Sequence, residues 1–444
     1  MRAVMRSQAI LLSAHAGRLA LSVGIASLLG RGLAPADFGF VALVSSIYIV
    51  ATELLDMGTT AAATREMAAD PAREGASLAA LLALRRWLAL AAAAALVVLA
   101  CSGYVAGASE RLVLVAAAAG LFALHLHGYQ LAFQLRQAYG RVTALALCGQ
   151  AGFLVAAAVA IELHAGGAVI ALLVVVREAV QALVARWMAV RILGARVAVA
   201  WRDPGAARLF HAAWMLGAAG LAYKLTAHAG GYMLWALDSP EALATFNAAQ
   251  RLLLPMADMA WLVVVPLIAA MSGTVVRDAT AFRAQLEGHV TFLMALSALV
   301  AVAGWFIAPV LLRVLYGDLY ASGPWSAVAT FRWLALGYLF ALVTPVLVVG
   351  EMVQGNARAL LVTTASALAA NLAANAWAVR AHGPEGAALV LVACEAYVFF
   401  VLFARSLSRG QVRVRAAWAL YLVPAALLIP VLWWLAPMLP GGAP

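Results

Sequence analysis

The sequence predicts an all-α, polytopic membrane protein with about 12 to 14 transmembrane helices, and three observations carry this prediction. The chain has 444 residues, of which 66% are hydrophobic and 11% charged, whereas soluble domains carry about 25% charged residues. Its mean hydropathy is +0.97. Apolar segments long enough to span a bilayer recur along the whole chain, and they lack the alternating pattern of a membrane β-barrel.

Thirteen segments fit a membrane span: residues 8–30, 38–58, 83–105, 111–133, 142–163, 167–189, 209–236, 243–270, 289–312, 328–349, 359–379, 386–405 and 417–437. We expect two pseudo-symmetric six-helix lobes around a central cavity. Residues 1–207 form the N-terminal lobe with a basic linker, residues 208–405 form the C-terminal lobe, and residues 406–444 add a C-terminal helix.

An internal repeat supports the division into two lobes. Arg141 and Arg358 follow similar segments and lie 217 residues apart, as do Glu178 and Glu395. Each half holds an even number of predicted spans, so both halves enter the membrane from the same side. This arrangement is typical of transporters whose substrate site lies between parallel repeats.

The net charge of +10 is explained by membrane orientation and needs no nucleic-acid partner. If the N-terminus is cytoplasmic, 20 of the 29 basic residues fall in cytoplasmic segments and five on the opposite side, as the positive-inside rule requires. The chain also lacks a nucleotide-binding loop of the form G-x-x-x-x-G-K-S/T. Transport would therefore use an ion gradient or the substrate's own disequilibrium.

Residues 211–261 carry the strongest candidates for a substrate site. Lys224, the only lysine, shares a helix face with His228, and Arg251 shares a face with Asp258 on the next predicted helix. A charge inside a span costs several kcal/mol unless it faces water or a partner, so such residues mark functional sites. The alternative is that neighbouring glycines allow close helix packing and that the charges pair or reach the membrane surface.

The first predicted span adds His15 and Arg18, which share one helix face. If they face the same cavity as Lys224 and Arg251, that cavity is cationic and suits a phosphate or pyrophosphate group. The alternative is a structural ion pair between Arg18 and an acid of a neighbouring helix.

Three acids are candidates for ion coupling. Glu53 and Asp56 lie one turn apart and could take up a proton, or they could neutralise Arg65 and Arg85 at the inner rim. Asp258 lies near the middle of its span and is the better proton or sodium candidate.

Other polar residues have structural interpretations. Arg177 and Glu178 are adjacent, so their directions differ by about 100° on a helix, which disfavours a direct pair. Asn371 and Asn375 are expected to bond between helices. The three cysteines, Cys101, Cys148 and Cys394, lack metal-ligand spacing and are expected to be core residues. The two histidines His125 and His127 are expected on different helix faces, and no metal or cofactor is predicted.

Several segments resemble one family of transporters. They are LLGRGLAPADFGF (28–40), ELLDMGTTAAATRE (53–66), DSPEALATFNAAQRL (238–252), LYGDLYASGPWSAVATFRWLAL (315–336) and NLAANAWAVRAHGPEGAALV (371–390). They resemble the polysaccharide transporter family of Wzx-type oligosaccharide flippases. This family belongs to the multidrug/oligosaccharidyl-lipid/polysaccharide exporter superfamily. It usually has twelve or fourteen spans, whereas thirteen are predicted here.

The resemblance implies a transporter and not an enzyme, located in the bacterial inner membrane. It would move an undecaprenyl-pyrophosphate-linked oligosaccharide from the cytoplasmic to the periplasmic leaflet, for O-antigen or exopolysaccharide synthesis. The implied partners are the lipid-linked oligosaccharide, membrane lipids and other polysaccharide-assembly proteins. The alternatives are a drug/cation antiporter, which would favour acids in its cavity, and a membrane-embedded polysaccharide polymerase or ligase, which would need a larger external loop.

Overall fold

The computed structural model describes residues 2–70, 73–136, 138–192, 194, 195, 197, 200–413 and 418. All regular secondary structure within these residues is helical. The chain divides into two compact units, Met1–Lys224 and Leu225–Pro444, so that the division falls inside one long helix. The predicted additional span at residues 417–437 lies outside the described residues, apart from Trp418.

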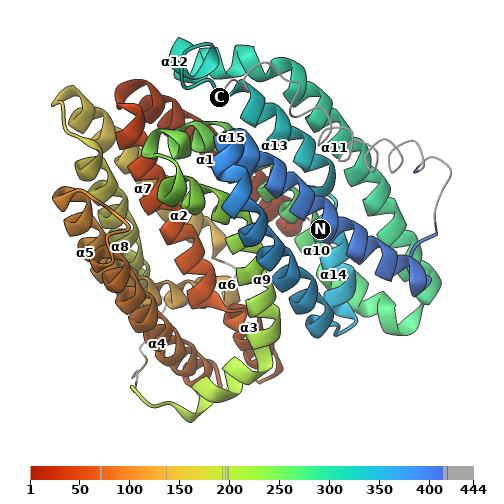
Figure 1. Cartoon of the computed structure of the whole chain (residues 1–444). Coiled ribbons are helices and arrows are strands. Elements are labelled where there is room, and N and C mark those ends of the chain that lie inside the picture. Colours follow the sequence, from red (N-terminus) through yellow and green to blue (C-terminus); the bar gives the residue numbers. More distant parts are fainter. Residues whose placement is uncertain are drawn as a thin grey trace. The chain divides into compact units, whose positions relative to one another are not determined.

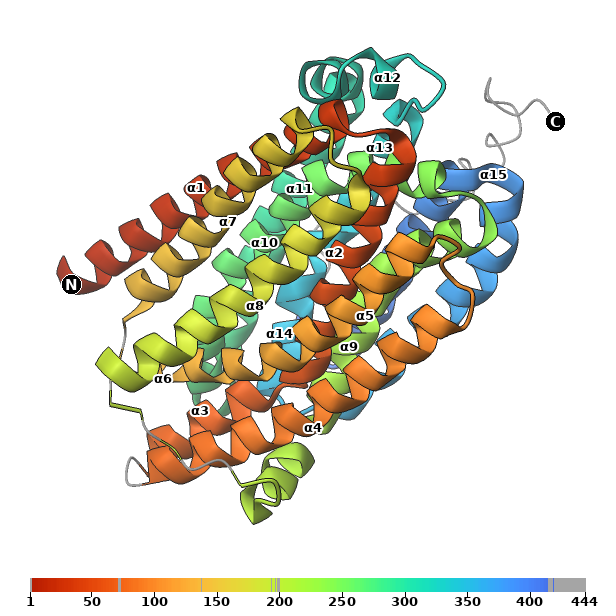
Figure 2. The ribbon, with the colours of Figure 1, turned by 90° about the vertical axis from the view of Figure 1, so that its left-hand side faces the viewer.

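The first unit is a bundle of apolar helices (Figures 1 and 2). Its elements are α1 (Arg2–Gly32), α2 (Pro35–Asp56), α3 (Thr59–Ala69), α4 (Glu74–Cys101), α5 (Ala108–Ala123), the 3₁₀ helix η2 (Leu124–Tyr129), α6 (Gln130–Leu135), α7 (Tyr139–Glu162), α8 (Gly167–Ile192) and most of α9 (Pro204–Leu237). Helix α7 packs against α1 and α8, while α5 packs against α4 and α8.

The second unit begins within α9. Its further elements are α10 (Pro240–Arg277), α11 (Ala279–Tyr316), α12 (Asp318–Ala321), α13 (Val328–Ala341), α14 (Thr344–Val353) and α15 (Ala357–Ser408). Helix α13 packs between α11 and α15 (Figure 1). The Asp278 carboxylate caps α11 by accepting hydrogen bonds from the Thr280 and Ala281 N–H groups, each at 3.0 Å.

Helix α15 consists of two helical segments joined at Gly383, whose backbone (φ 52°, ψ −133°) is not helical. Asn371 donates to Cys394 Sγ (3.6 Å) and so links the two segments. Asn375 instead donates to Asn371 Oδ1 (2.9 Å), so the expected bond between helices forms only for Asn371. An amide one turn away is already within reach of Asn375 Nδ2, whereas Asn375 Oδ1 is buried without a hydrogen-bond partner among the described residues.

The pair α7 and α8 corresponds to the two segments of α15. Arg141 and Arg358 both lie in the first turn after their helix begins, at Tyr139 and Ala357. The second member of each pair starts after a turn that contains a left-handed residue, His164 (φ 56°) in one and Gly383 in the other. The repeat read from the sequence therefore coincides with a repeated helix–turn–helix.

Eight helical stretches of the described residues are long and apolar enough to cross a membrane: Pro35–Met67, Glu74–Cys101, Ala108–Phe133, Gly140–Glu162, Gly167–Ile192, Ala279–Tyr316, Val328–Val353 and Ala357–Ser408. They cover nine of the thirteen predicted spans, because α15 contains two. The predicted spans 8–30, 209–236 and 243–270 are helical in α1, α9 and α10. The chain is a multi-pass helical membrane protein.

The expectation of core cysteines is wrong for two of the three. Cys394 is buried, but Cys101 and Cys148 are exposed. In a membrane-spanning bundle an outward side chain meets lipid and not water, so a small apolar residue in a span need not be in the core.

Candidate functional site

A break between α2 and α3 positions the acidic candidates. Met57 (φ 40°) and Gly58 (φ 71°) are both left-handed, a conformation that costs about 1 kcal/mol for a residue with a side chain. The Met57 N–H still donates to the Glu53 carbonyl (2.9 Å). Glu53 and Asp56 therefore lie on the last turn of α2, directly before the break.

Asp56 is bound by a cation and a hydroxyl. Arg85 of α4 forms an ion pair with Asp56, Thr60 of α3 donates to the same carboxylate, and Arg85 also donates to Thr60 Oγ1 (2.7 Å). The Arg85 side chain is 9% exposed and that of Asp56 34%. Of the two arginines expected to neutralise Asp56, the structure pairs it with Arg85.

These side chains border a pocket of about 290 Å³ within the first unit. Its polar lining includes Glu53, Asp56, Arg85, His127 and Gln130. Two lining atoms, Arg85 Nε and His127 Nε2, are buried without a hydrogen-bond partner among the described residues. The pocket therefore has two acids on one helix turn, together with an arginine whose Nε lacks a hydrogen-bond acceptor among the described residues. We call it the acidic pocket.

Lys224 belongs to the same unit and lies near Glu53. The face of α9 that carries Lys224 packs on the α2–α3 break through glycines: a Cβ at Gly217 would lie 2.1 Å from the Met57 carbonyl group, and one at Gly220 2.8 Å from Glu53 Oε1. Two turns beyond Gly217, the half-buried Lys224 interacts electrostatically with Glu53. Gly217 and Gly220 thus allow the close helix packing that was the alternative interpretation of these glycines. The same packing brings Lys224 close to Glu53.

Two further cationic candidates, His228 and Arg251, lie in the second unit. His228 follows Lys224 by one turn of α9 and is buried, with its ring centroid 6.5 Å from that of Tyr232. Arg251 of α10 is half-buried and interacts electrostatically with Tyr316. Next to it, Gln250 donates to the Ala227 carbonyl (2.8 Å).

The structure does not place three of the predicted site residues beside the acidic pocket or beside His228 and Arg251. The Arg18 side chain is exposed on α1 and is absent from the lining of the acidic pocket. The side chains of His15 and Asp258 lie outside the described residues, although both positions are helical. Among the described residues, no cluster of three His, Cys, Asp or Glu side chains could hold a metal ion.

The expectation that Arg177 and Glu178 do not pair is wrong. Arg177 Nε donates to Glu178 Oε1 (3.1 Å), and the guanidinium lies over the Phe153 ring, 5.1 Å from its centroid. A helical-wheel angle describes the Cα–Cβ direction, whereas the long arginine side chain folds around the helix and reaches its neighbour.

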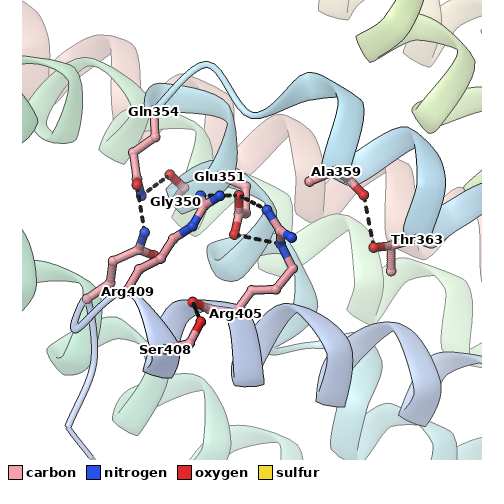
Figure 3. Close-up of polar contacts among 9 residues, drawn as sticks. Gly350, Glu351, Gln354, Ala359, Thr363, Arg405, Ser408 and Arg409 are labelled. Carbon is pink, nitrogen blue, oxygen red and sulfur yellow. Dashed lines mark hydrogen bonds and ion pairs between the residues drawn. The ribbon is translucent and has the colours of Figure 1, made fainter.

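Sequence reasoning missed a buried acid in the second unit. Figure 3 shows Glu351 of α14 between Arg405 and Arg409 at the end of α15. The Glu351 side chain is 0% exposed, with Arg405 Nε at 3.3 Å and Arg409 Nη1 at 3.1 Å from its carboxylate. Gln411 donates to Gln354 Oε1 (2.6 Å) beside it. The available signal was one acid in an apolar helix and two arginines one turn apart.

His127 and Gln130 of the acidic pocket were also missed as site residues. His125 and His127 lie on a 3₁₀ helix, and they line two different pockets. Their different faces follow from the spacing, but a lone histidine in an apolar segment gave no signal of a pocket.

Comparisons with solved structures show which proteins share this helical fold. The chain is similar to a lipid II flippase MurJ in an inward closed conformation, with a TM-score of 0.74 and 10% identity over 97% of this chain and 92% of that one. It is also similar to an inward-facing multidrug resistance MATE family transporter of the MOP superfamily, with a TM-score of 0.65 and 13% identity over 88% of this chain and 94% of that one. At these identities the likeness shows a shared fold.

A third structure with this fold is a MOP superfamily transporter from Pyrococcus furiosus, with a TM-score of 0.60 and 14% identity over 92% of this chain and 95% of that one. A search of curated proteins gave no match. The family model described as polysaccharide biosynthesis protein matches residues 4–276, more than half of the chain. The chain belongs to this polysaccharide biosynthesis family.

Proposed function

We propose that the protein is a flippase that moves an undecaprenyl-pyrophosphate-linked oligosaccharide from the cytoplasmic to the periplasmic leaflet of a bacterial inner membrane. The observation that carries the proposal is the family match over residues 4–276. The product would serve surface or exopolysaccharide synthesis, in concert with other polysaccharide-assembly proteins.

Basic residues inside apolar helices support an anionic cargo. Lys224 and Arg251 lie in α9 and α10, where a charge is retained at a cost of several kcal/mol. A lysine offers a point charge and an arginine a fork of donors, and both suit a pyrophosphate. In this mechanism Lys224, Arg251, Arg18, His228 and His15 bind the head group while the polyprenyl chain stays in lipid.

We further propose that a proton gradient drives transport through the acidic pocket. Asp56 is occupied by Arg85 and Thr60, whereas Glu53 lines the pocket and interacts with Lys224. Protonation of Glu53 would release Lys224 to bind the pyrophosphate, and cargo release would restore the pair. Asp258 remains a second candidate for ion coupling.

The experiment measures which leaflet holds the lipid-linked sugars in cells that lack the gene. An impermeant glycan-cleaving enzyme is applied to opened envelopes and to sealed inverted vesicles. Complete oligosaccharide accumulated on the cytoplasmic face is the expected result. An unchanged distribution with normal polymer would contradict the proposal, and repeat units stranded on the outer face would indicate a polymerase or ligase.

Complementation by Lys224 variants tests the cargo site. Lys224→Ala should abolish transport at normal expression, whereas Lys224→Arg should retain part of it because the charge remains. Arg191→Ala, at an exposed position of α8, is the matched control and should transport normally. Full transport by Lys224→Ala would remove Lys224 from the site.

A drug/cation antiporter is the second candidate function, and the pair of acids in the pocket favours it. Such a protein would bind a cation at Glu53, the acid of this pocket that is not paired with Arg85. Drug resistance conferred by the wild type and lost in Glu53→Gln, together with an unchanged leaflet distribution, would support the antiporter over the flippase.

A further inference from the structure

A second pocket in the first unit has a basic lining and is separate from the acidic pocket. It has a volume of about 220 Å³ and is bordered by Arg86 of α4, His125 and Tyr129 of η2, and Arg186 of α8, with Val197 among its apolar neighbours. Among the described residues, none of those that line it is an acid. The two arginines are also the charged groups that act on the His125 ring. An anion in this pocket would meet two guanidinium groups and a phenol hydroxyl.

The pocket lies at the depth of a membrane surface. Helix α8 begins at Gly167, and Arg186 follows after 19 residues, which at 1.5 Å per residue is about 29 Å of helix. This length matches the hydrocarbon thickness of a bilayer, about 30 Å. Exposed tryptophans flank the two arginines: Trp87 is 52% and Trp187 59% exposed. Tryptophans at this level are typical of the interface between lipid and water.

Two described residues between α8 and α9 adjoin the basic lining: Val197 borders the pocket, and Trp201 contacts Arg86. Trp201 lies under the Arg86 guanidinium, 4.5 Å from the ring centroid, and its carbonyl accepts a hydrogen bond from Trp87 Nε1 (2.8 Å). The Trp201 contact holds Arg86 in a fixed direction, so the guanidinium is positioned before a ligand arrives.

We propose that this pocket binds the phosphate of an anionic phospholipid headgroup. The basic lining supplies the charge and the bidentate donors that a phosphate needs. The interfacial depth and the exposed tryptophans favour a lipid over a soluble phosphate, because the acyl chains can stay in the bilayer beside α4 and α8. Basic pockets between transmembrane helices are known to hold such headgroups.

The test titrates the purified full-length protein in detergent with phosphatidylglycerol or phosphatidylcholine and counts retained lipids by native mass spectrometry. The wild type should retain phosphatidylglycerol in preference. Arg186→Gln should weaken this binding about fivefold, the effect of one basic residue at a membrane surface. Arg191→Gln removes the same charge from an exposed position of the same helix and should bind like the wild type.

Three results would overturn the proposal. Equal retention of both lipids would show that headgroup charge is not recognised, and equal losses in Arg186→Gln and Arg191→Gln would show diffuse attraction without a site. Displacement of phosphatidylglycerol by millimolar inorganic phosphate would show a free-phosphate site. Because Arg186 is exposed, the unfolding temperature of Arg186→Gln should equal that of the wild type, and Arg186→Lys should restore part of the binding.

Discussion

The two units each contain an ion pair between an acid and arginine, but burial is distributed in opposite ways. In the first unit Arg85 is 9% exposed and its partner Asp56 is 34% exposed, beside a pocket. In the second unit Glu351 is 0% exposed, while Arg405 and Arg409 are 33% and 37% exposed. The Asp56 carboxylate is open to the pocket, whereas the Glu351 carboxylate is enclosed by protein. The difference separates a pair available for function from one that fixes helices together.

Removing both arginines around Glu351 should have the largest effect on stability. Arg405→Gln with Arg409→Gln leaves a buried carboxylate without a cation, which costs about 3 kcal/mol of unfolding free energy. Thermal and denaturant unfolding of the purified protein measure this loss. Adding Glu351→Gln should recover most of it, and Arg358→Gln, an exposed arginine of α15, should have no effect. Equal stability of the double variant and the wild type would contradict the structural role.

A side chain at Gly217 should disturb the packing beside the first pair. In Gly217→Ala the new Cβ would lie 2.1 Å from Met57 backbone atoms, so α9 or the α2–α3 break must move, at a cost of about 2 kcal/mol. Gly24→Ala is the matched control, because no heavy atom lies within 4 Å of its Cβ position, and it should be neutral or slightly stabilising. Comparable unfolding temperatures for the two variants would show that the contact is not maintained.

Neutralising Asp56 should lower the free energy of unfolding by less than removing the two arginines around Glu351. Asp56→Asn keeps a hydrogen-bond acceptor for Arg85, which borders the pocket, so we expect a loss of about 1 kcal/mol. A double-mutant cycle with Arg85→Gln measures the coupling of the two side chains through their unfolding free energies. The double variant should be more stable than the sum of the single variants predicts. Strict additivity would show that the pair contributes nothing.

The smallest effect is expected at Asp278, an exposed acid of the second unit. Hydrogen bonds from Thr280 and Ala281 lower the pKa of Asp278 below its ordinary value of 3.8. Because the folded-state pKa is the lower one, the cap stabilises the protein above pH 3.8 and this contribution disappears as the pH falls through the lowered pKa. Asp278→Ala should lower the unfolding temperature slightly at pH 7, and the difference from the wild type should shrink below pH 3.8. A constant difference would contradict the cap.

Hydropathy and charge spacing predicted the helices and part of the acidic site. Nine of the thirteen predicted spans lie in helical stretches long and apolar enough to cross a membrane, because about 20 residues of helix are needed to cross a bilayer. Asp56 and Arg85 could be connected from their positions at one membrane surface. Glu351 could not be assigned to Arg405, because their contact spans 54 residues and depends on how α14 packs on α15. The pocket around His127 likewise forms only when α2, α4 and η2 meet.

The contacts of Trp201 shorten the free length of the segment that connects α8 to α9. Eleven residues separate Ile192 at the end of α8 from Pro204 at the start of α9, and a free chain could extend over roughly 40 Å between these two positions. With Trp201 held by Arg86 and Trp87, two residues remain between the anchored position and α9, a reach of about 10 Å. The start of α9 is thus connected to α4 by a short segment, so that a displacement of one helix is transmitted to the other.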